Sequence, residues 1–357
     1  MKRAIILGLL ALASGSGAQA PTITYPDVKP DRAFAFPADH GAHPAFRTEW
    51  WYVTGSLRTQ TGTELGFQIT FFRTRPRVDP RNPSAFAARQ IMFAHVALSD
   101  PALKRLRHDQ RASRSGFGIA GASAGDADVS IRDWRLVRQK DGRFVAKIAA
   151  RDFTLALTFT PTQPPLLQGV GGYSRKGPDP RSASYYYSLP QLATVGTITR
   201  GRGAAEPVTG RAWLDREWSS RYLGGEAVGW DWTGLNFDDG RALMAFRIRG
   251  KSGTTLWAGG TYRRASGAAV TLTPQNVLFT PLARWRSKRT KALYPVAQRV
   301  TITLPEGAQA FDLRPAFPDQ ELDSRSSGLP VYWEGLVRTT GATGYLELTG
   351  YAAPLAM

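Results

Sequence analysis

The feature that most constrains this chain is the alternation of apolar and polar residues over many short segments. In residues 153–160 every second residue is Phe or Leu, and in residues 300–304 every second residue is Val, Ile or Leu. A period of two places these side chains on one face of a β-strand. Turn sequences such as Asp141-Gly142 lie between such runs, as in hairpins. Because helical periodicity is almost absent, the pattern predicts an all-β fold of antiparallel barrels or sandwiches.

Two segments of the chain resemble each other at a constant offset of 179 residues. The offset aligns Trp51 with Trp230 and Thr54 with Thr233, and it also aligns apolar residues of the strand that follows. Two unrelated amphipathic hairpins could look alike by chance. The shared Trp-x-x-Thr-Gly pattern favours a duplicated β-domain.

The boundary between the two copies is predicted near residues 199–208. This stretch is rich in small and polar residues and contains Pro207, which is typical of a linker or a loop tip. We therefore expect two tandem antiparallel β-barrels, one in residues 21–204 and one in residues 205–357.

The first twenty residues have the layout of a secretory signal peptide. Lys2 and Arg3 precede an apolar run at 4–13, and the segment ends in Ala18-Gln19-Ala20. The apolar run is shorter than the ~20 residues that span a bilayer. We expect cleavage after Ala20 and export of the mature chain to the periplasm or the medium.

The composition narrows the possible partners. The chain has 46 basic and 28 acidic residues, a net charge of +18, and no cysteine. A disulfide framework, a thiol nucleophile and a thiolate metal site are therefore excluded. Such a positive charge often indicates nucleic-acid binding, but because we expect export, we predict no nucleic-acid partner. Peripheral contact with an anionic membrane or with an anionic envelope polymer is the expected alternative, unless the charges are only spread over solvated strand faces.

The densest polar stretch begins at Asp39. Its two histidines, His40 and His43, could ligate a metal with Asp39, but we predict no metal because a closed site needs further ligands. In the strand that follows, Glu49 shares a face with Trp51. A carboxyl group beside a tryptophan is partly desolvated and is a candidate general acid, although it could equally pair with an arginine.

A second acidic stretch lies at residues 213–218. Trp213, Asp215 and Glu217 share one strand face, and Trp218 lies on the other. Two carboxyl groups at i and i+2 repel each other, so one can retain its proton and act as an acid. The alternative is a solvated face on which neighbouring arginines neutralise both groups.

Aromatic residues supply the candidate ligand-binding positions. They gather in short strand segments where one face could line a barrel. The candidates are Trp51, Tyr185, Tyr187, Trp213, Trp230 and Trp232.

Several motifs resemble those of the carotenoid 1,2-hydratase/AttH-like family, in the same order and over nearly the whole mature chain. They occupy residues 36–55, 67–73, 93–97, 210–218 and 230–232. The resemblance implies two tandem lipocalin-like barrels, an apolar lipid- or terpenoid-like ligand, no cofactor, and an ABC-transporter partner in the envelope.

The resemblance also implies a chemistry. In the hydratases of the family an acid protonates an isolated alkene, aromatic rings stabilise the carbocation, and water adds. Asp215, Glu217 and Glu49 are the candidate acids here, and Trp218 is the candidate aromatic group next to them. Arg216 stands where those hydratases have histidine, and arginine does not donate protons at useful pH. Three hypotheses follow: an exported ligand-binding protein, a hydratase or isomerase, and a basic module for anionic polymers.

Overall fold

The computed structural model describes residues 23–79 and 81–355. The predicted signal peptide lies outside these residues. The helices among them are 3-10 turns of three residues each, at Ala38–His40, Pro274–Asn276 and Arg325–Ser327. No helix in the described ranges is long and apolar enough to cross a membrane.

The strands follow one another along the chain, and most of the connections between them are short. In order they are β1 (Thr48–Thr59), β2 (Glu64–Thr74), β3 (Ile91–Ser99), β4 (Arg107–Arg114), β5 (Ala120–Ala122), β6 (Asp128–Ile131), β7 (Trp134–Arg138), β8 (Phe144–Ala149), β9 (Phe153–Thr160), β10 (Leu166–Leu167), β11 (Tyr173–Arg175), β12 (Ala183–Arg200), β13 (Glu206–Arg221), β14 (Ala227–Phe237), β15 (Ala242–Gly250), β16 (Thr255–Arg263), β17 (Ala269–Leu272), β18 (Val277–Arg286), β19 (Leu293–Leu304), β20 (Gly307–Pro315), β21 (Glu321–Asp323), β22 (Val331–Thr339) and β23 (Ala342–Leu348).

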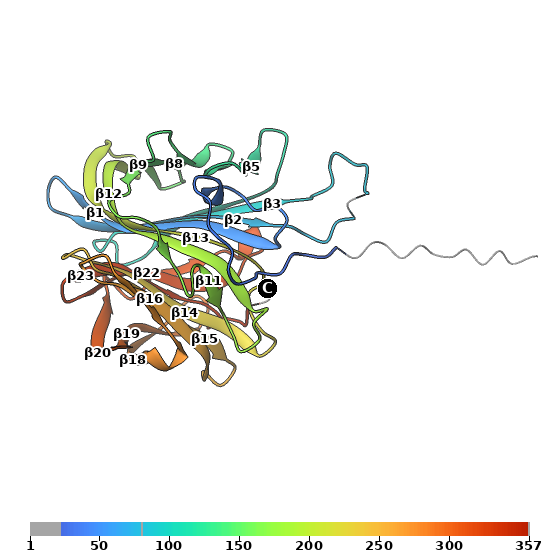
Figure 1. Ribbon diagram of the computed structural model, residues 1–357. Coiled ribbons are helices and arrows are strands. Elements are labelled where there is room, and N and C mark those ends of the chain that lie inside the picture. The colour runs from blue at the N-terminus through green and yellow to red at the C-terminus, as the bar shows by residue number, and fades with distance from the viewer. Residues whose placement is uncertain (1–22, 80, 356–357) are drawn as a thin grey trace, which may run out of the picture.

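These strands form two antiparallel sheets that face each other (Figure 1). The first runs in the order β4-β3-β2-β1-β13-β12-β9-β8-β7-β6-β5, with β10 and β11 paired to β12. The second runs in the order β17-β16-β15-β14-β23-β22-β20-β19-β18, with β21 paired to β22. The all-β prediction with two antiparallel, lipocalin-like sheets is confirmed.

Three apolar clusters hold the molecule together. The first lies inside the curve of the first sheet and contains Phe67 and Trp218, and the second lies inside the second sheet and contains Trp333. The third lies between the sheets and includes Tyr186 and Trp232. Strands such as β1 and β14 therefore bury both faces, one against their own core and one against the other sheet.

The boundary predicted at 204/205 does not match the division between the sheets. β13 pairs with β1 on one side and with β12 on the other, so it is a central strand of the first sheet. The second sheet begins only with β14, after the exposed residues 224–226. The Pro- and Gly-containing stretch at 199–208 is a hairpin turn within the first sheet, because turn chemistry marks hairpins and linkers alike.

The repeat is present as a pair of hairpins, but the offset of 179 pairs the wrong residues. β1 and β2 pair Gly55 with Phe67, whereas β14 and β15 pair Gly234 with Met244. The turns of the two hairpins are equally long, and a constant offset of 178 fits both strands, because it aligns the pair Leu57 and Leu65 with the pair Leu235 and Leu243. At an offset of 179 each residue of one hairpin is matched to one on the opposite face, because a slip of one residue reverses every side chain.

Candidate functional site

A cavity of about 330 Å³ lies between the two sheets. Its outer end is lined by residues at strand ends, such as Arg47, Thr74 and Pro330, and its inner end by buried residues, such as Gln68 and Tyr332. The walls combine aromatic rings with carboxyl groups from both sheets. This volume is at the lower end of the range for small-molecule sites.

Asp215 of β13 faces this cavity and is buried. Burial, reinforced by the charge of Glu217, raises the pKa of Asp215 to about 7, against hydrogen bonds that favour the carboxylate. The donors are Ser188 Oγ at 2.5 Å, Tyr186 OH at 2.6 Å and Trp213 Nε1 at 2.6 Å. A carboxyl group that titrates near neutrality can both give and take a proton.

Glu217 lies two residues further along the same strand face and is held as an ion pair. Its carboxylate is 2.9 Å from Lys176 Nζ and accepts a hydrogen bond from Ser184. Burial lowers the pKa of Lys176, while the Glu217 charge opposes that change. The ammonium group also lies 4.8 Å from the ring of Tyr186 and 4.4 Å from that of Phe246. Of the two carboxyl groups predicted from the sequence, Glu217 is therefore bound to a lysine, and Asp215 is the one whose raised pKa lets it be neutral.

Two further carboxyl groups reach the cavity from the second sheet, and the sequence reasoning missed both. Glu334 of β22 and Glu347 of β23 are direct cross-strand partners and face the same side. Burial and the nearby Glu347 charge raise the pKa of Glu334 well above its usual value, and burial raises that of Glu347 to about 7. The only signal in the sequence is a glutamate among apolar residues in each strand, which is also common on solvated faces.

Aromatic rings complete the walls. Trp232 packs edge-on against Tyr52 at 5.3 Å and donates from Nε1 to the hydroxyl of Tyr186, which in turn donates to Asp215. Tyr222 lies between Trp50 at 5.0 Å and Trp230 at 5.5 Å. Trp213 supports this wall through its bond to Asp215. Trp230 and Trp232 of the predicted ligand-binding set therefore line the cavity.

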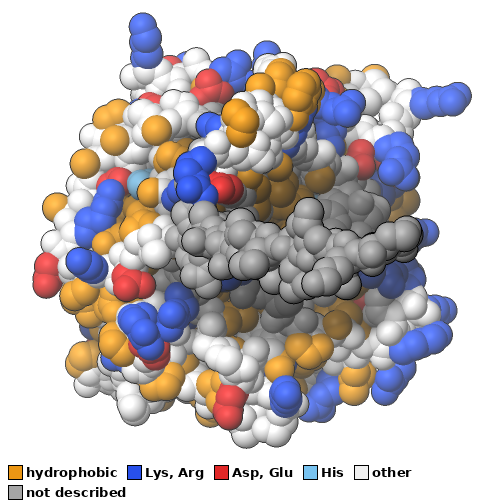
Figure 2. Space-filling model, turned by 90° about the vertical axis from the view of Figure 1, so that its right-hand side faces the viewer, with side chains coloured by type: hydrophobic (Ala, Val, Ile, Leu, Met, Phe, Trp, Pro, Cys, Tyr) orange, Lys and Arg blue, Asp and Glu red, His pale blue; other side chains and the backbone are white. Residues whose placement is uncertain are grey.

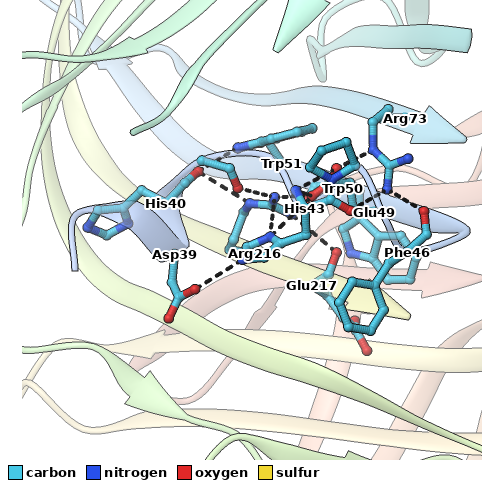
Figure 3. Close-up of polar contacts among 12 residues, drawn as sticks. Asp39, His40, His43, Phe46, Glu49, Trp50, Trp51, Arg73, Arg216 and Glu217 are labelled. Carbon is cyan, nitrogen blue, oxygen red and sulfur yellow. Dashed lines mark hydrogen bonds and ion pairs between the residues drawn. The ribbon is translucent and has the colours of Figure 1, made fainter. Parts of the chain in front are cut away.

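Glu49 lies on the opposite face of β1, inside the first sheet, and forms a buried ionic cluster (Figure 3). It pairs with Arg73 and Arg216 and accepts hydrogen bonds from the backbone N–H of His43. Burial alone would raise the pKa of Glu49, but Arg216, His43 and Arg73 outweigh it and hold that pKa far below its usual value. A carboxylate held in this way cannot donate a proton, and it does not line the cavity.

The other predicted residues lie in the core of the first sheet. Trp218 stacks on His43 with ring centroids 3.7 Å apart, and Tyr185 packs beside it at 5.6 Å. Trp51 lies under the guanidinium of Arg216 at 3.9 Å, and Tyr187 is buried in the same core. The structure therefore places Trp218, Trp51, Tyr185 and Tyr187 away from the cavity, because their strand faces point into the barrel.

The two histidines near Asp39 contact different side chains, a tyrosine hydroxyl for His40 and a carboxylate for His43. His40 Nδ1 is 2.6 Å from Tyr187 OH, and burial lowers the pKa of His40 to about 3. His43 Nε2 is 3.0 Å from Asp39. Asp39 also accepts from Arg32 at 3.0 Å. These contacts fasten the segment before β1 to the core of the first sheet.

The comparisons with known proteins agree with this architecture. The sequence model of the AttH-like family matches residues 27–351. The crystal structure of an AttH candidate from Nitrosomonas europaea is 53% identical, covers 91% of this chain and 99% of its own, and superposes with a TM-score of 0.85. A search of curated proteins found no match.

Two more distant solved structures share the fold. Kievitone hydratase from Nectria haematococca is 15% identical, covers 93% of this chain and 97% of its own, and has a TM-score of 0.67. The structure of CghA with Sch210972 is 13% identical, covers 86% of this chain and 89% of its own, and has a TM-score of 0.51. The family match and the 53% identical relative together decide the family. The chain belongs to the AttH-like family.

Proposed function

We propose that the cavity between the sheets binds an apolar, unsaturated lipid- or terpenoid-like ligand and protonates it, as a hydratase or isomerase does. The observation that carries the proposal is the position of Asp215. Its carboxyl group is buried in a wall of tryptophan and tyrosine rings, and its pKa of about 7 leaves a large neutral fraction at physiological pH. Kievitone hydratase, which has this fold, is named for a hydration.

In the proposed reaction Asp215 gives its proton to one carbon of an isolated double bond. The π electrons form the new C–H bond and leave a tertiary carbocation, which the faces of Trp230 and Trp232 stabilise electrostatically. Water then adds to the cation and loses a proton to a carboxylate in the cavity, which balances the addition of H₂O. Loss of a neighbouring proton instead of water addition gives an isomer. An ordinary ligand-binding protein remains the alternative, because the same walls bind apolar molecules without chemistry.

Deuterium incorporation tests the enzyme hypothesis directly. Farnesene and farnesol are incubated with the protein in D₂O, and the products are analysed by mass spectrometry. Protonation from Asp215 places one deuterium on carbon, either in a tertiary alcohol or in an isomer. Asp215→Asn should abolish incorporation, whereas Glu49→Gln, outside the cavity, should retain it in the fraction that folds. Absence of carbon-bound deuterium with the wild-type protein would leave only the binding function.

We further propose contact with an anionic membrane through one exposed patch. Phe86 and Phe117 are 67% and 58% exposed, their rings stack at 5.5 Å, and Arg114 lies 4.7 Å from each. The loop that carries Phe86 projects from the side of the molecule that faces the viewer in Figure 2, where apolar side chains lie among lysines and arginines. Exposed aromatic rings beside cations are suited to the interface of an anionic bilayer.

Co-sedimentation with vesicles tests this contact. Vesicles of phosphatidylglycerol should bind the protein at low salt, and vesicles of phosphatidylcholine should not. The double variant Phe86→Ser, Phe117→Ser should lose binding, while Leu278→Ser, an exposed leucine on β18, should retain it. Dimer formation by the wild-type protein that the double variant abolishes would assign the patch to a second copy instead. Export and an ABC-transporter partner stay predictions.

A further inference from the structure

The inner end of the cavity contains buried polar groups that have no hydrogen-bond partner among the described residues. They are both carboxyl oxygens of Glu334, Oε1 of Gln68, Nε2 of His95 and the hydroxyl of Tyr52. All four residues line the cavity, and each is at most 6% exposed. An unsatisfied buried polar group costs about 1–3 kcal/mol, so such groups are rare without a purpose. Four of them facing one space indicate a missing polar partner.

The surrounding contacts determine which of these groups can donate a hydrogen bond and which can accept one. Gln68 Nε2 donates to Tyr332 OH and to Thr70 Oγ1, each at 3.0 Å, so its Oε1 is left as an acceptor. The Tyr332 hydroxyl also lies 2.9 Å from His95 Nδ1. The Tyr332 hydroxyl can donate its hydrogen bond to His95 Nδ1. The proton of the neutral His95 ring then lies on Nε2. Burial lowers the pKa of His95 to about 3, so the ring is neutral.

The inner end therefore presents a donor, His95 Nε2–H, together with an acceptor, Gln68 Oε1. The Tyr52 hydroxyl can act in either way. It lies beside the Glu334 carboxyl group, whose charge and hydrogen bonding both contribute to raising the pKa of Tyr52, although the two groups are not in good hydrogen-bond geometry. A group that both donates and accepts a hydrogen bond complements this set.

The charges that line the cavity decide which polar group of a ligand can bind there. Asp215, Glu217, Glu334 and Glu347 face the cavity, and the one lysine that lines it, Lys176, is already bound to Glu217. Of the arginines that line the cavity, Arg73 is bound to Glu49 and Arg47 lies at the outer end. At the inner end a carboxylate or phosphate group of a ligand would therefore meet the carboxyl group of Glu334 with no arginine or lysine beside it. A neutral hydroxyl group meets no such penalty, and unlike an ammonium group it can also accept a hydrogen bond from His95 Nε2–H.

We propose that Gln68, His95, Tyr52 and Glu334 form a hydroxyl-binding subsite, so that the ligand is a long-chain or terpenoid alcohol rather than a hydrocarbon, an acid or an amine. The subsite lies in the cavity of the proposed function and rests on it. Because the four residues come from β1, β2, β3 and β22, the subsite exists only where the two sheets meet.

Competition binding tests the subsite with matched probes. Displacement of the neutral fluorophore N-phenyl-1-naphthylamine is measured with farnesol, farnesene, farnesoic acid and farnesylamine, which share a carbon skeleton and differ in the polar end. Farnesol should bind at least tenfold more tightly than each of the other three. Gln68→Leu and Glu334→Gln should each reduce this preference by weakening the binding of farnesol, and continued displacement of the fluorophore by farnesene shows that the cavity of each variant is intact. Gln298→Leu, a buried glutamine in the second core, should leave the preference unchanged.

The outcomes separate this inference from the proposed function. Equal affinity for farnesol and farnesene would overturn the subsite, while deuterium incorporation into farnesene would still support the proposed function. Tightest binding of the acid or the amine would overturn the hydroxyl assignment. Failure of all four compounds to displace the fluorophore would overturn the ligand-binding cavity and the subsite with it.

Discussion

Single residues in this protein carry opposite roles according to the side of the strand on which they lie. Asp215 and Glu49 are both buried carboxyl groups on neighbouring strands. Asp215 accepts only from neutral donors, so burial wins and its pKa rises. Glu49 faces Arg73 and Arg216, so its pKa falls. The partner of a buried carboxyl group, rather than burial itself, decides whether it can act as an acid.

The raised pKa of Asp215 predicts a characteristic pH dependence. Its pKa is about 7 in the folded protein and 3.8 as the ordinary value, so the folded state binds more protons between these values. The stability contribution of this group is therefore complete below pH 4 and declines as the pH rises to 7, by up to about 4 kcal/mol. Thermal unfolding of Asp215→Asn should show a flatter dependence than the wild type over this range. Deuterium incorporation should decline about tenfold per pH unit above pH 7.

Asp39 is the matched control because its pKa is shifted in the opposite direction to that of Asp215. Burial alone would raise its pKa, but hydrogen bonds from His43, Arg32 and the Ala35 N–H hold that pKa well below its usual value. The contribution of Asp39 to the free energy of unfolding is present above pH 4 and is lost as the pH falls. Asp39→Asn should therefore destabilise the protein most at neutral pH. If the two variants shift the pH profile in the same direction, the assigned pKa changes are wrong.

Arg216 is predicted to stabilise the fold rather than to act on the ligand. It is fully buried, pairs with Glu49, and donates to the carbonyl of Gly41 at 2.5 Å. Arg216→Leu leaves Glu49 with a single arginine and should lower the free energy of unfolding by about 3–5 kcal/mol, measured by urea denaturation. The double variant with Glu49→Gln should be less destabilised than the sum of the single variants. Wild-type stability of Arg216→Leu combined with loss of farnesol binding would contradict this role.

At the scale of elements, β13 determines how the site is assembled. One face of this strand supplies Asp215 and Glu217 to the cavity, and the other supplies Arg216 and Trp218 to the first core. Its pairing with β1 and β12 joins the two sides of the first sheet. The site therefore depends on a strand of one sheet whose outer face is completed by the second sheet.

Hydrogen exchange of a variant tests this assignment of β13. A Cβ at Gly344 of β23 would overlap the backbone oxygen of Gly234 on β14, so Gly344→Ala should loosen the second sheet. Gly125→Ala is the control, because a Cβ there meets open space. Amides of β14 to β23 should exchange faster in Gly344→Ala, and those of β13 should remain as protected as those of β1. Faster exchange of β13 together with β14 would show that β13 belongs with the second sheet.

At the scale of the whole molecule, the contact between the sheets is both a core and a binding site. The third apolar cluster draws residues from each sheet, and the cavity opens beside it. A ligand held there contacts both sheets, so its binding energy adds to the energy that joins them.

Ligand binding is therefore expected to stabilise the two sheets together. Farnesol at one hundred times its Kd should add about 2.7 kcal/mol to the free energy of unfolding and raise a single Tm in calorimetry. Glu334→Gln, with a weakened subsite, should show a smaller rise at the same concentration, whereas Gln298→Leu should show the full rise. Stabilisation of only one of two resolved transitions would indicate that the ligand binds inside one barrel.

The sequence by itself determined the strands, the fold class and the side chains that share a face. Asp215 with Glu217, and Trp230 with Trp232, could be grouped in this way because alternation with a period of two is a local property. Alternation does not say which of two buried faces looks into a barrel and which looks at the other sheet. Only the packing of the sheets decided that the face of Asp215, and not that of Glu49 and Trp218, lines the cavity. The same packing brought Glu334 and Glu347 into the cavity of Asp215 from strands more than one hundred residues away, an arrangement that no local pattern specifies.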